Sequence, residues 1–312
     1  WWGVDNFRQE DYKPLELQNG KKIASLNLRF YYRIGRSLSA QYPRIDNETK
    51  LWAEDHLNLI LIQNKDDQWL RLYESKLLLL KGDSKGALES IKLILKKPKQ
   101  EFWAWALLGD IVSLKDSKKA ILCYQHAINL SHIPTSVVNV REKLAKLLVL
   151  ESKHLEAVLQ IKKALELRKK LGSNKISNDL NQMISTDWFK KHANANLPKE
   201  IDVSNFVVDI IYNEEDLVFK TGVVDNQNKI KKLAHVSFGL SDGVVLTHNQ
   251  FSEISYVGIG SIINVFFEEG SHSPIRWKRA GQSVIDGLLH EFTGILEQVP
   301  EKDFGFIRTT LK

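Results

Sequence analysis

The sequence predicts an α+β protein of several domains, in which an all-α helical solenoid is followed by one or more small all-β barrels. Three observations predict this fold class. Alanines recur in one helical register before residue 170, an Ala-Asn-Leu-Pro stretch ends the helical pattern near residue 196, and short runs of β-branched and aromatic residues follow. The chain has 312 residues, of which 43% are hydrophobic, so it can form about two cores.

The helical register is clearest at Ala87, Ala120 and Ala157, whose intervals bracket about 34 residues. The copy around Ala120 contains Trp105, Leu108, Gly109, Ala120, Tyr124, Ala127 and Pro134. This pattern resembles the tetratricopeptide repeat, and the resemblance covers residues 67–170. It implies stacked helix pairs, in which small residues lie where two helices cross.

Helical spacing elsewhere extends the predicted solenoid to residues 1–192. Residues 23–40 and 49–62 have apolar residues at helical intervals and add helices on the N-terminal side, behind an irregular cap of about twenty residues. Residues 176–189 have one apolar and one polar face, which is typical of a helix that caps the end of a solenoid. The next residues, 193–200, are a predicted linker.

The region after the linker contains five short runs that alternate apolar and polar residues, with turn residues between them. These runs are residues 203–212, 217–224, 234–238, 243–247 and 261–267. Five strands in about 80 residues favour a small closed barrel over a sandwich. Together with Gly222, Gly258 and Gly260, the pattern resembles an oligonucleotide/oligosaccharide-binding (OB) barrel over residues 201–283.

The last residues contain a second β pattern, Phe-Thr-Gly-Ile-Leu at 292–296 followed by Asp-Phe-Gly-Phe-Ile-Arg at 303–308. It resembles the first two strands of a cold-shock-type domain, so residues 284–312 are predicted to begin a second β domain. The resemblance implies that Phe304 and Phe306 stack on bases, with Arg308 in the same interface. Asp303 departs from the family pattern, because its carboxylate would repel phosphate. The alternative is that both rings lie in a core.

Net charge favours an anionic partner, since the chain carries +6 and has a pI of about 9.1. Cations beside an aromatic ring are typical of single-strand binding sites, because the cations contact phosphates while the ring stacks on a base. The predicted nucleic-acid contacts in the first barrel are Arg276, Trp277, Lys278, Arg279, Lys229, Lys231 and Lys232. In the alternative interpretation, Trp277 packs inward and the cations only face solvent.

The solenoid is predicted to bind a protein partner in its concave groove. The resemblance to tetratricopeptide repeats implies that Lys76, Asp110 and Lys146 face this groove from successive first helices. No asparagine lies near the places where co-chaperones of that family hold a terminal carboxylate, so a chaperone-tail clamp is not expected. The expected ligand is another folded protein or an extended peptide.

Motifs of enzymes and cofactor sites are missing from the sequence, which has no Walker-type glycine loop, Gly-x-Ser-x-Gly elbow, His-Glu-x-x-His or paired Cys-x-x-Cys. The nine histidines have no ligand spacing. We therefore expect no catalytic residue, no metal and no cofactor. A single cysteine, Cys123, favours a reducing, cytoplasmic compartment. No apolar run reaches the roughly 18 residues of a membrane span.

These observations favour a non-enzymatic adaptor, whose solenoid binds a protein and whose barrels bind single-stranded RNA or DNA. Proteins that resemble this combination occur in bacterial stress and antiphage-type gene clusters, which is the context that the resemblance implies. The alternative is a protein-only scaffold, in which the barrels pack on the solenoid and bind no nucleic acid.

Overall fold

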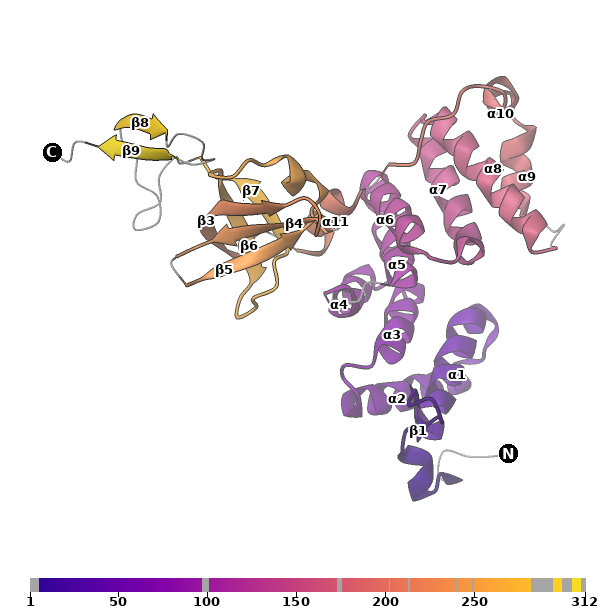
Figure 1. Ribbon diagram of the computed structural model, residues 1–312. Helices are drawn as coiled ribbons and strands as arrows, with labels where there is room; N and C mark the ends of the chain where they lie inside the picture. Colours follow the sequence, from indigo (N-terminus) through magenta and orange to yellow (C-terminus); the bar gives the residue numbers. More distant parts are fainter. Residues whose placement is uncertain are drawn as a thin grey trace. The chain divides into compact units, whose positions relative to one another are not determined.

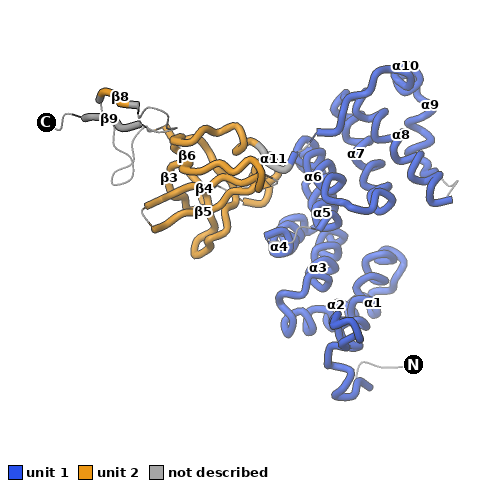
Figure 2. The backbone as a smooth tube through the Cα atoms, in the orientation of Figure 1, with its two compact units in different colours: residues 1–203 blue, residues 204–312 orange. Residues whose placement is uncertain are grey.

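The computed structural model of the chain consists of two compact units, residues 1–203 and residues 204–312 (Figures 1 and 2). It describes residues 6–96, 101–172, 176–201, 203–212, 214–239, 241–248, 250–281, 294–298 and 305–309. The predicted order of the fold class, helices first and strands after, is confirmed. The two units are considered separately below.

The first unit is helical. After the short 3-10 helix η2 (Gln9–Tyr12) and the hairpin of β1 (Leu15–Glu16) and β2 (Lys22–Ile23), its helices are α1 (Leu26–Gln41), α2 (Asn47–Gln63), α3 (Gln68–Leu80), α4 (Ser84–Leu95), α5 (Phe102–Val112), α6 (Ser117–Leu130), α7 (Val138–Leu150), α8 (His154–Lys170), α9 (Asn178–Ser185) and α10 (Asp187–His192). Short 3-10 turns, η3 (Tyr42–Arg44) and η4 (Pro134–Val137), precede α2 and α7. The closest packing is within the pairs α3–α4, α5–α6 and α7–α8, and α4 and α6 each pack on the helix that follows.

Aspartates fix where several of these helices begin. The carboxylates of Asp67, Asp83 and Asp116 accept backbone N–H groups in the first turns of α3, α4 and α6. Each carboxylate satisfies donors that have no partner inside the helix. The turns that precede α3, α4 and α6 are therefore well defined.

Small residues lie at the helix crossings. Ala87, Ala120 and Ala157 are fully buried, and the Ser75 hydroxyl donates a hydrogen bond of 2.8 Å to the carbonyl oxygen of Ala87. At the equivalent crossing in the next pair, a Cβ added to Gly109 would lie 2.5 Å from Cε1 of Tyr124. Any larger side chain there would push the two helices apart.

The C-terminal end of the helical unit differs from the single predicted capping helix. The chain forms two helices, α9 and α10, because Thr186 adopts an extended conformation between them, with φ −72° and ψ 153°. Leu180, Met183 and Phe189 are buried against the last pair. The predicted capping function of this apolar face is therefore shared by two short helices.

The predicted linker, residues 193–200, contacts the helices at its end. The Glu200 carboxylate accepts hydrogen bonds from Arg141, from Lys163 Nζ at 2.6 Å and from Gln160 Nε2 at 3.1 Å. Burial alone would raise the pKa of Glu200, but these hydrogen bonds outweigh it and lower the pKa to about 2. The next carbonyl, that of Ile201, accepts a hydrogen bond of 3.1 Å from Asn129 Nδ2. The chain is thus anchored on the helical unit just before that unit ends.

The second unit is built on an antiparallel five-stranded sheet in the order β5-β4-β3-β6-β7. Its elements are α11 (Ser204–Ile211), the 3-10 helix η5 (Glu214–Asp216), β3 (Leu217–Asn228), β4 (Leu233–Ser237), β5 (Gly243–Thr247), the 3-10 helix η6 (Ser252–Tyr256), β6 (Ile262–Glu268) and β7 (Arg276–Arg279). The strands β6-β3-β4-β5 have the order of a Greek key. Within the described part of the chain, β5 and β7 each pair on one side only, so hydrogen bonds do not close the predicted barrel.

The prediction of a strand at residues 203–212 is wrong, since most of this run forms helix α11. Val203, Val207 and Ile211 are each at most 3% exposed, and their spacing of four residues places them on one helical face. β-Branched composition favoured a strand, but burial of this face favours a helix. The fifth strand of the sheet is β7 instead.

A bulge bends the long central strand β3. The register to β4 shifts between Val224 and Asn226, which leaves Asp225 as the extra residue. On the inner side, Val224, Val236, Leu246 and Ile263 are fully buried in the core of this unit. Gly222 is required beside the bulge, because an added Cβ would lie 2.6 Å from both the Phe238 ring and the Ser237 carbonyl oxygen.

A hairpin of β8 (Gly294–Gln298) and β9 (Gly305–Thr309) follows the five-stranded sheet. It spans part of the segment that was predicted to begin a cold-shock-type domain. Phe306 and Arg308 lie in β9, where Phe306 pairs with Glu297. Phe304 lies outside the described residues, so its predicted stacking stays a prediction.

Candidate functional site

The structure places the predicted basic group at residues 276–279 on β7, beside β6. Arg276 forms an ion pair with Asp209 of α11, and its guanidinium carbon lies 4.6 Å from the centre of the Phe266 ring. Trp277 is half-buried and packs against the core, which is the alternative considered for this residue. Lys278 and Arg279 are exposed. Of this group, the last two cations present the most charge to solvent.

An exposed aromatic ring that the sequence did not single out lies two strands away. Phe219 on β3 is 56% exposed and pairs directly with Phe266 on β6, at a ring separation of 5.4 Å. Since Phe266 also pairs with Arg276, these three side chains form one row across β3, β6 and β7. Strand alternation alone could not find Phe219, because Val218 and Lys220 beside it are exposed as well.

The second basic group, Lys229, Lys231 and Lys232, lies in the turn between β3 and β4. All three lysines are exposed, and the backbone N–H of Lys231 bonds to Asn228 Oδ1 at 2.8 Å. This turn follows the C-terminal end of β3. Strand β7 lies toward the other end of β3, because it pairs with the part of β6 that pairs with residues 219–222. The structure therefore separates the two predicted basic groups.

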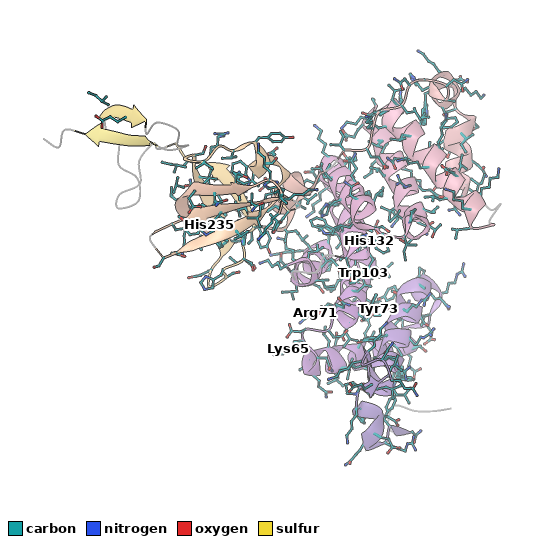
Figure 3. The ribbon with its side chains drawn as sticks, viewed as in Figure 1. Lys65, Arg71, Tyr73, Trp103, His132 and His235 are labelled. Carbon is teal, nitrogen blue, oxygen red and sulfur yellow. The ribbon has the colours of Figure 1, made fainter. Side chains whose placement is uncertain are left out.

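A polar cluster lies on β3 and β4, close to the basic turn. His235 Nδ1 is 2.7 Å from Asp225 Oδ1, and the Ser237 hydroxyl donates a hydrogen bond of 2.5 Å to Asp225 Oδ2. Burial would raise the pKa of Asp225, but its bonds to Ser237 and His235 lower it below the ordinary value. The carboxylate thus fixes the orientation of the His235 ring, which remains partly exposed (Figure 3).

Glycine gives this histidine its position. A Cβ added to Gly243 on β5 would lie 2.9 Å from both Cε1 and Nε2 of His235. The imidazole ring therefore lies close to the backbone of the neighbouring strand, with Val245, 46% exposed, as its direct partner on β5. The bulge that positions Asp225 could not be predicted from local sequence, and neither could this cluster.

On the helical unit, the three predicted groove residues occur on α3, α5 and α7. Asp110 accepts hydrogen bonds from Lys143 Nζ at 2.6 and 2.7 Å and from the Tyr124 hydroxyl at 2.7 Å. Lys146 forms an ion pair with Asp179 of α9. These two predicted contacts for a partner are therefore already engaged between neighbouring helix pairs.

Lys76 has a different environment. Burial lowers its pKa, although the nearby carboxylate of Asp110 acts in the opposite direction. Its ammonium group lies 5.9 Å from the centre of the Tyr73 ring on the same helix. Lys76 is therefore a partly buried cation close to an aromatic ring and a carboxylate.

Two tryptophans that the sequence did not assign to the groove lie at the starts of α3 and α5. The rings of Trp69 and Trp103 are stacked, with centroids 4.9 Å apart and an interplanar angle of 23°. Trp69 remains 36% exposed. The stack offers a flat apolar surface that a peptide could cover.

Two other kinds of site are not present in the described part of the chain. No group of three or more His, Cys, Asp or Glu side chains could hold a metal ion there. In the same residues, no helix combines the length and the apolarity that a membrane crossing requires. Cys123 is buried in α6, and burial raises the pKa of its thiol, so it is not a reactive nucleophile.

Comparison with known proteins identifies one similarity. Residues 68–202 match the family model described as "Domain of unknown function (DUF7017)". The match begins with α3 and ends after Ile201, so it includes the three regular helix pairs, α9, α10 and the anchored segment. No curated protein and no solved structure matches the chain.

Proposed function

We propose that the chain is a non-enzymatic adaptor with two ligands. A tetratricopeptide-like array of helices binds a protein or an extended peptide, and an OB-like β unit binds single-stranded RNA or DNA. The β unit carries the more specific part of the proposal, because its strand order and its charges both point to the same ligand.

The strand order supports an OB-like unit. An OB fold is a five-stranded, partly open Greek-key barrel, whose second and third strands and first loop contact oligonucleotides. In the present sheet, those elements correspond to β4, β5 and the turn between β3 and β4. The long, bulged β3 supplies the bend that a partly open barrel requires.

One observation carries the proposal of nucleic-acid binding. The turn with Lys229, Lys231 and Lys232 leads directly into β4, the strand that presents His235. Lysines of this kind neutralise phosphates, and the partly exposed imidazole gives a flat surface for a base. Within the described residues, no ion pair involves these three lysines.

The test measures fluorescence anisotropy of labelled single-stranded RNA and DNA over a range of salt concentrations. We expect binding at low salt that weakens as salt rises, with the logarithmic slope reduced by about 0.7 for each phosphate contact removed. Replacing Lys229, Lys231 and Lys232 by glutamine should therefore lower the slope by about 2. Replacing Lys278 and Arg279 tests the separate group on β7.

The matched control replaces three exposed lysines of the helical unit, Lys115, Lys118 and Lys153, by glutamine. This control changes the net charge by the same amount. An equal loss of affinity in the control would mean that only net charge attracts the nucleic acid. Absence of binding to both nucleic acids at low salt would favour the protein-only scaffold.

For the helical array, the stacked Trp69–Trp103 pair and Lys76 support a peptide ligand. A peptide array probed with the chain should identify ligands whose binding weakens when Trp69 or Lys76 is replaced by alanine. Leu93, 50% exposed on the second helix of the same pair, gives the control variant Leu93→Ala. Equal binding by all three variants would place the ligand elsewhere.

A further inference from the structure

Helix α2 exposes an apolar face that no other described element of the helical unit covers. Leu51, Trp52, Leu59 and Ile62 are 62%, 44%, 59% and 64% exposed, while Ala53, Leu57, Ile60 and Leu61 on the other side are buried. The helix is therefore apolar on two faces. Four large apolar side chains in four turns exceed the isolated exposed residues that a soluble surface ordinarily carries.

The packing of the first helix pair explains why this face is uncovered. In the regular pairs, α4 and α6 pack against the first helix of the next pair. At the N-terminal end, α1 rather than α2 provides most of the packing against α3. Helix α2 therefore packs chiefly on α1, and its opposite face remains open.

The exposed face has the spacing of a helix–helix seam. Glu48, Leu51, Asp55, Asn58 and Ile62 follow one another at alternating intervals of three and four residues. Leu51 and Ile62 are the apolar members, and Trp52 and Leu59 flank the seam. The polar members are all exposed as well.

This seam is complementary to itself when a second copy runs antiparallel. Leu51 then lies opposite Ile62 of the partner subunit, and Asp55 lies opposite Asn58 of the partner subunit. Glu48, in the first turn, then lies toward the C-terminal end of the partner's α2, where Lys65 of the partner subunit follows the helix in an exposed turn (Figure 3 labels Lys65). A two-fold axis repeats each contact, which is the requirement for a closed dimer.

A parallel arrangement is less favourable, because it brings like charges into direct opposition. It would place Asp55 against Asp55 of the partner subunit and Glu48 against Glu48 of the partner subunit, so that like charges face each other. We propose that α2 is the interface of an antiparallel homodimer of this chain. The Asp55–Asn58 contact fixes its register, because the amide can donate a hydrogen bond to the carboxylate only in this alignment.

The size of the interface sets the expected affinity. A stable dimer buries about 800 Å² on each partner, and one face of a single helix provides less. Self-association through this face is therefore expected to be weak and dependent on concentration. The dimer therefore forms only where the chain is concentrated.

Sedimentation velocity of the chain over a range of concentrations tests the proposal. The sedimentation coefficient should rise with concentration, and Leu51→Glu and Ile62→Glu should each weaken self-association at least tenfold. Leu150→Glu is the matched control, since Leu150 is 76% exposed on α7 and lies outside the seam. Circular dichroism and thermal unfolding show that each variant is folded.

A charge exchange tests the antiparallel register. Glu48→Lys and Lys65→Glu should each weaken the dimer about threefold or more, and the double variant should restore most of the affinity. A monomer at every accessible concentration would overturn the proposal, and so would a dimer that Leu51→Glu leaves intact. Backbone amides of α2 could instead be strongly protected from hydrogen exchange in a monomer and lose this protection in Leu51→Glu. That result would show that another segment of the chain covers this face.

Discussion

The helical unit and the β unit use their charged side chains in different ways. In the helical unit, Asp110 bonds to Lys143 and Tyr124, and Lys146 bonds to Asp179, so charges join one helix pair to the next. In the β unit, Lys229, Lys231 and Lys232 lie together in an exposed turn. Charge on a groove-forming helix is therefore weak evidence of a ligand, because such charges can join neighbouring helices. A cluster of lysines in an exposed turn has less structural use and is stronger evidence.

The largest expected effect tests whether buried apolar faces, rather than charges, hold the array together. Trp105 is fully buried and lies edge-on to His126, with ring centroids 4.6 Å apart. Trp105→Ala should destabilise the helical unit by about 3–5 kcal/mol in chemical denaturation. Trp69→Ala is the control, and the loss of its exposed stacking contact should cost only about 1 kcal/mol.

A smaller effect tests the ion pairs between helix pairs. Asp110→Ala leaves the buried Tyr124 hydroxyl without its carboxylate acceptor and should destabilise the helical unit by about 1–3 kcal/mol. The control Asp187→Ala removes a fully exposed carboxylate and should change stability by less than about 0.5 kcal/mol. If the two variants were equally stable, Asp110 would contribute nothing to the packing of the helices. Its carboxylate would then be available for a ligand.

The third prediction concerns the exposed ring of the β unit. If Phe219 stacks on a base, Phe219→Ala should weaken single-strand binding by about 1–3 kcal/mol while thermal stability changes little. Tyr256→Ala is the control, at the last residue of η6, which is 85% exposed. Unchanged affinity for Phe219→Ala would restrict the interface to the β3–β4 turn and the face of β4.

The smallest expected effect concerns Glu200. Since its folded pKa is lowered to about 2 from an ordinary 4.5, the stability that it contributes is complete above about pH 4.5 and is lost as the pH falls toward 2. Glu200→Gln should remove about 1 kcal/mol of stability at pH 7 and less at pH 3, after allowance for solvent screening. Denaturation at both pH values checks this, and an identical loss at pH 7 and pH 3 would contradict the role of the charge.

Features that recur at a fixed interval along the chain were predicted best from the sequence. The intervals between Ala87, Ala120 and Ala157 identify buried positions, because stacked helix pairs repeat the same steric demand. Composition failed at residues 203–212, where the spacing of Val203, Val207 and Ile211 was the better signal for a helix.

The candidate sites were harder to predict, since they depend on register and on distant partners. The Asp225–His235 contact requires a bulge, and the row from Phe219 to Arg276 requires three strands in one alignment. Asp110 lies on the first helix of its pair, but its lysine partner lies 33 residues away in the next pair. Local sequence contains no signal for such a contact.

The way in which the first pair joins the array has a consequence for cooperativity. In a linear array, each pair is stabilised by its neighbours, so the coupling between neighbours decides where unfolding begins. Helix α1 makes most of the contact with α3, so α1 couples the N-terminal end to the array, whereas α2 is held chiefly by α1. Helix α2 should therefore be able to open while α1 stays packed on α3, and its amides should exchange hydrogen through a partial opening of lower free energy than those of α6.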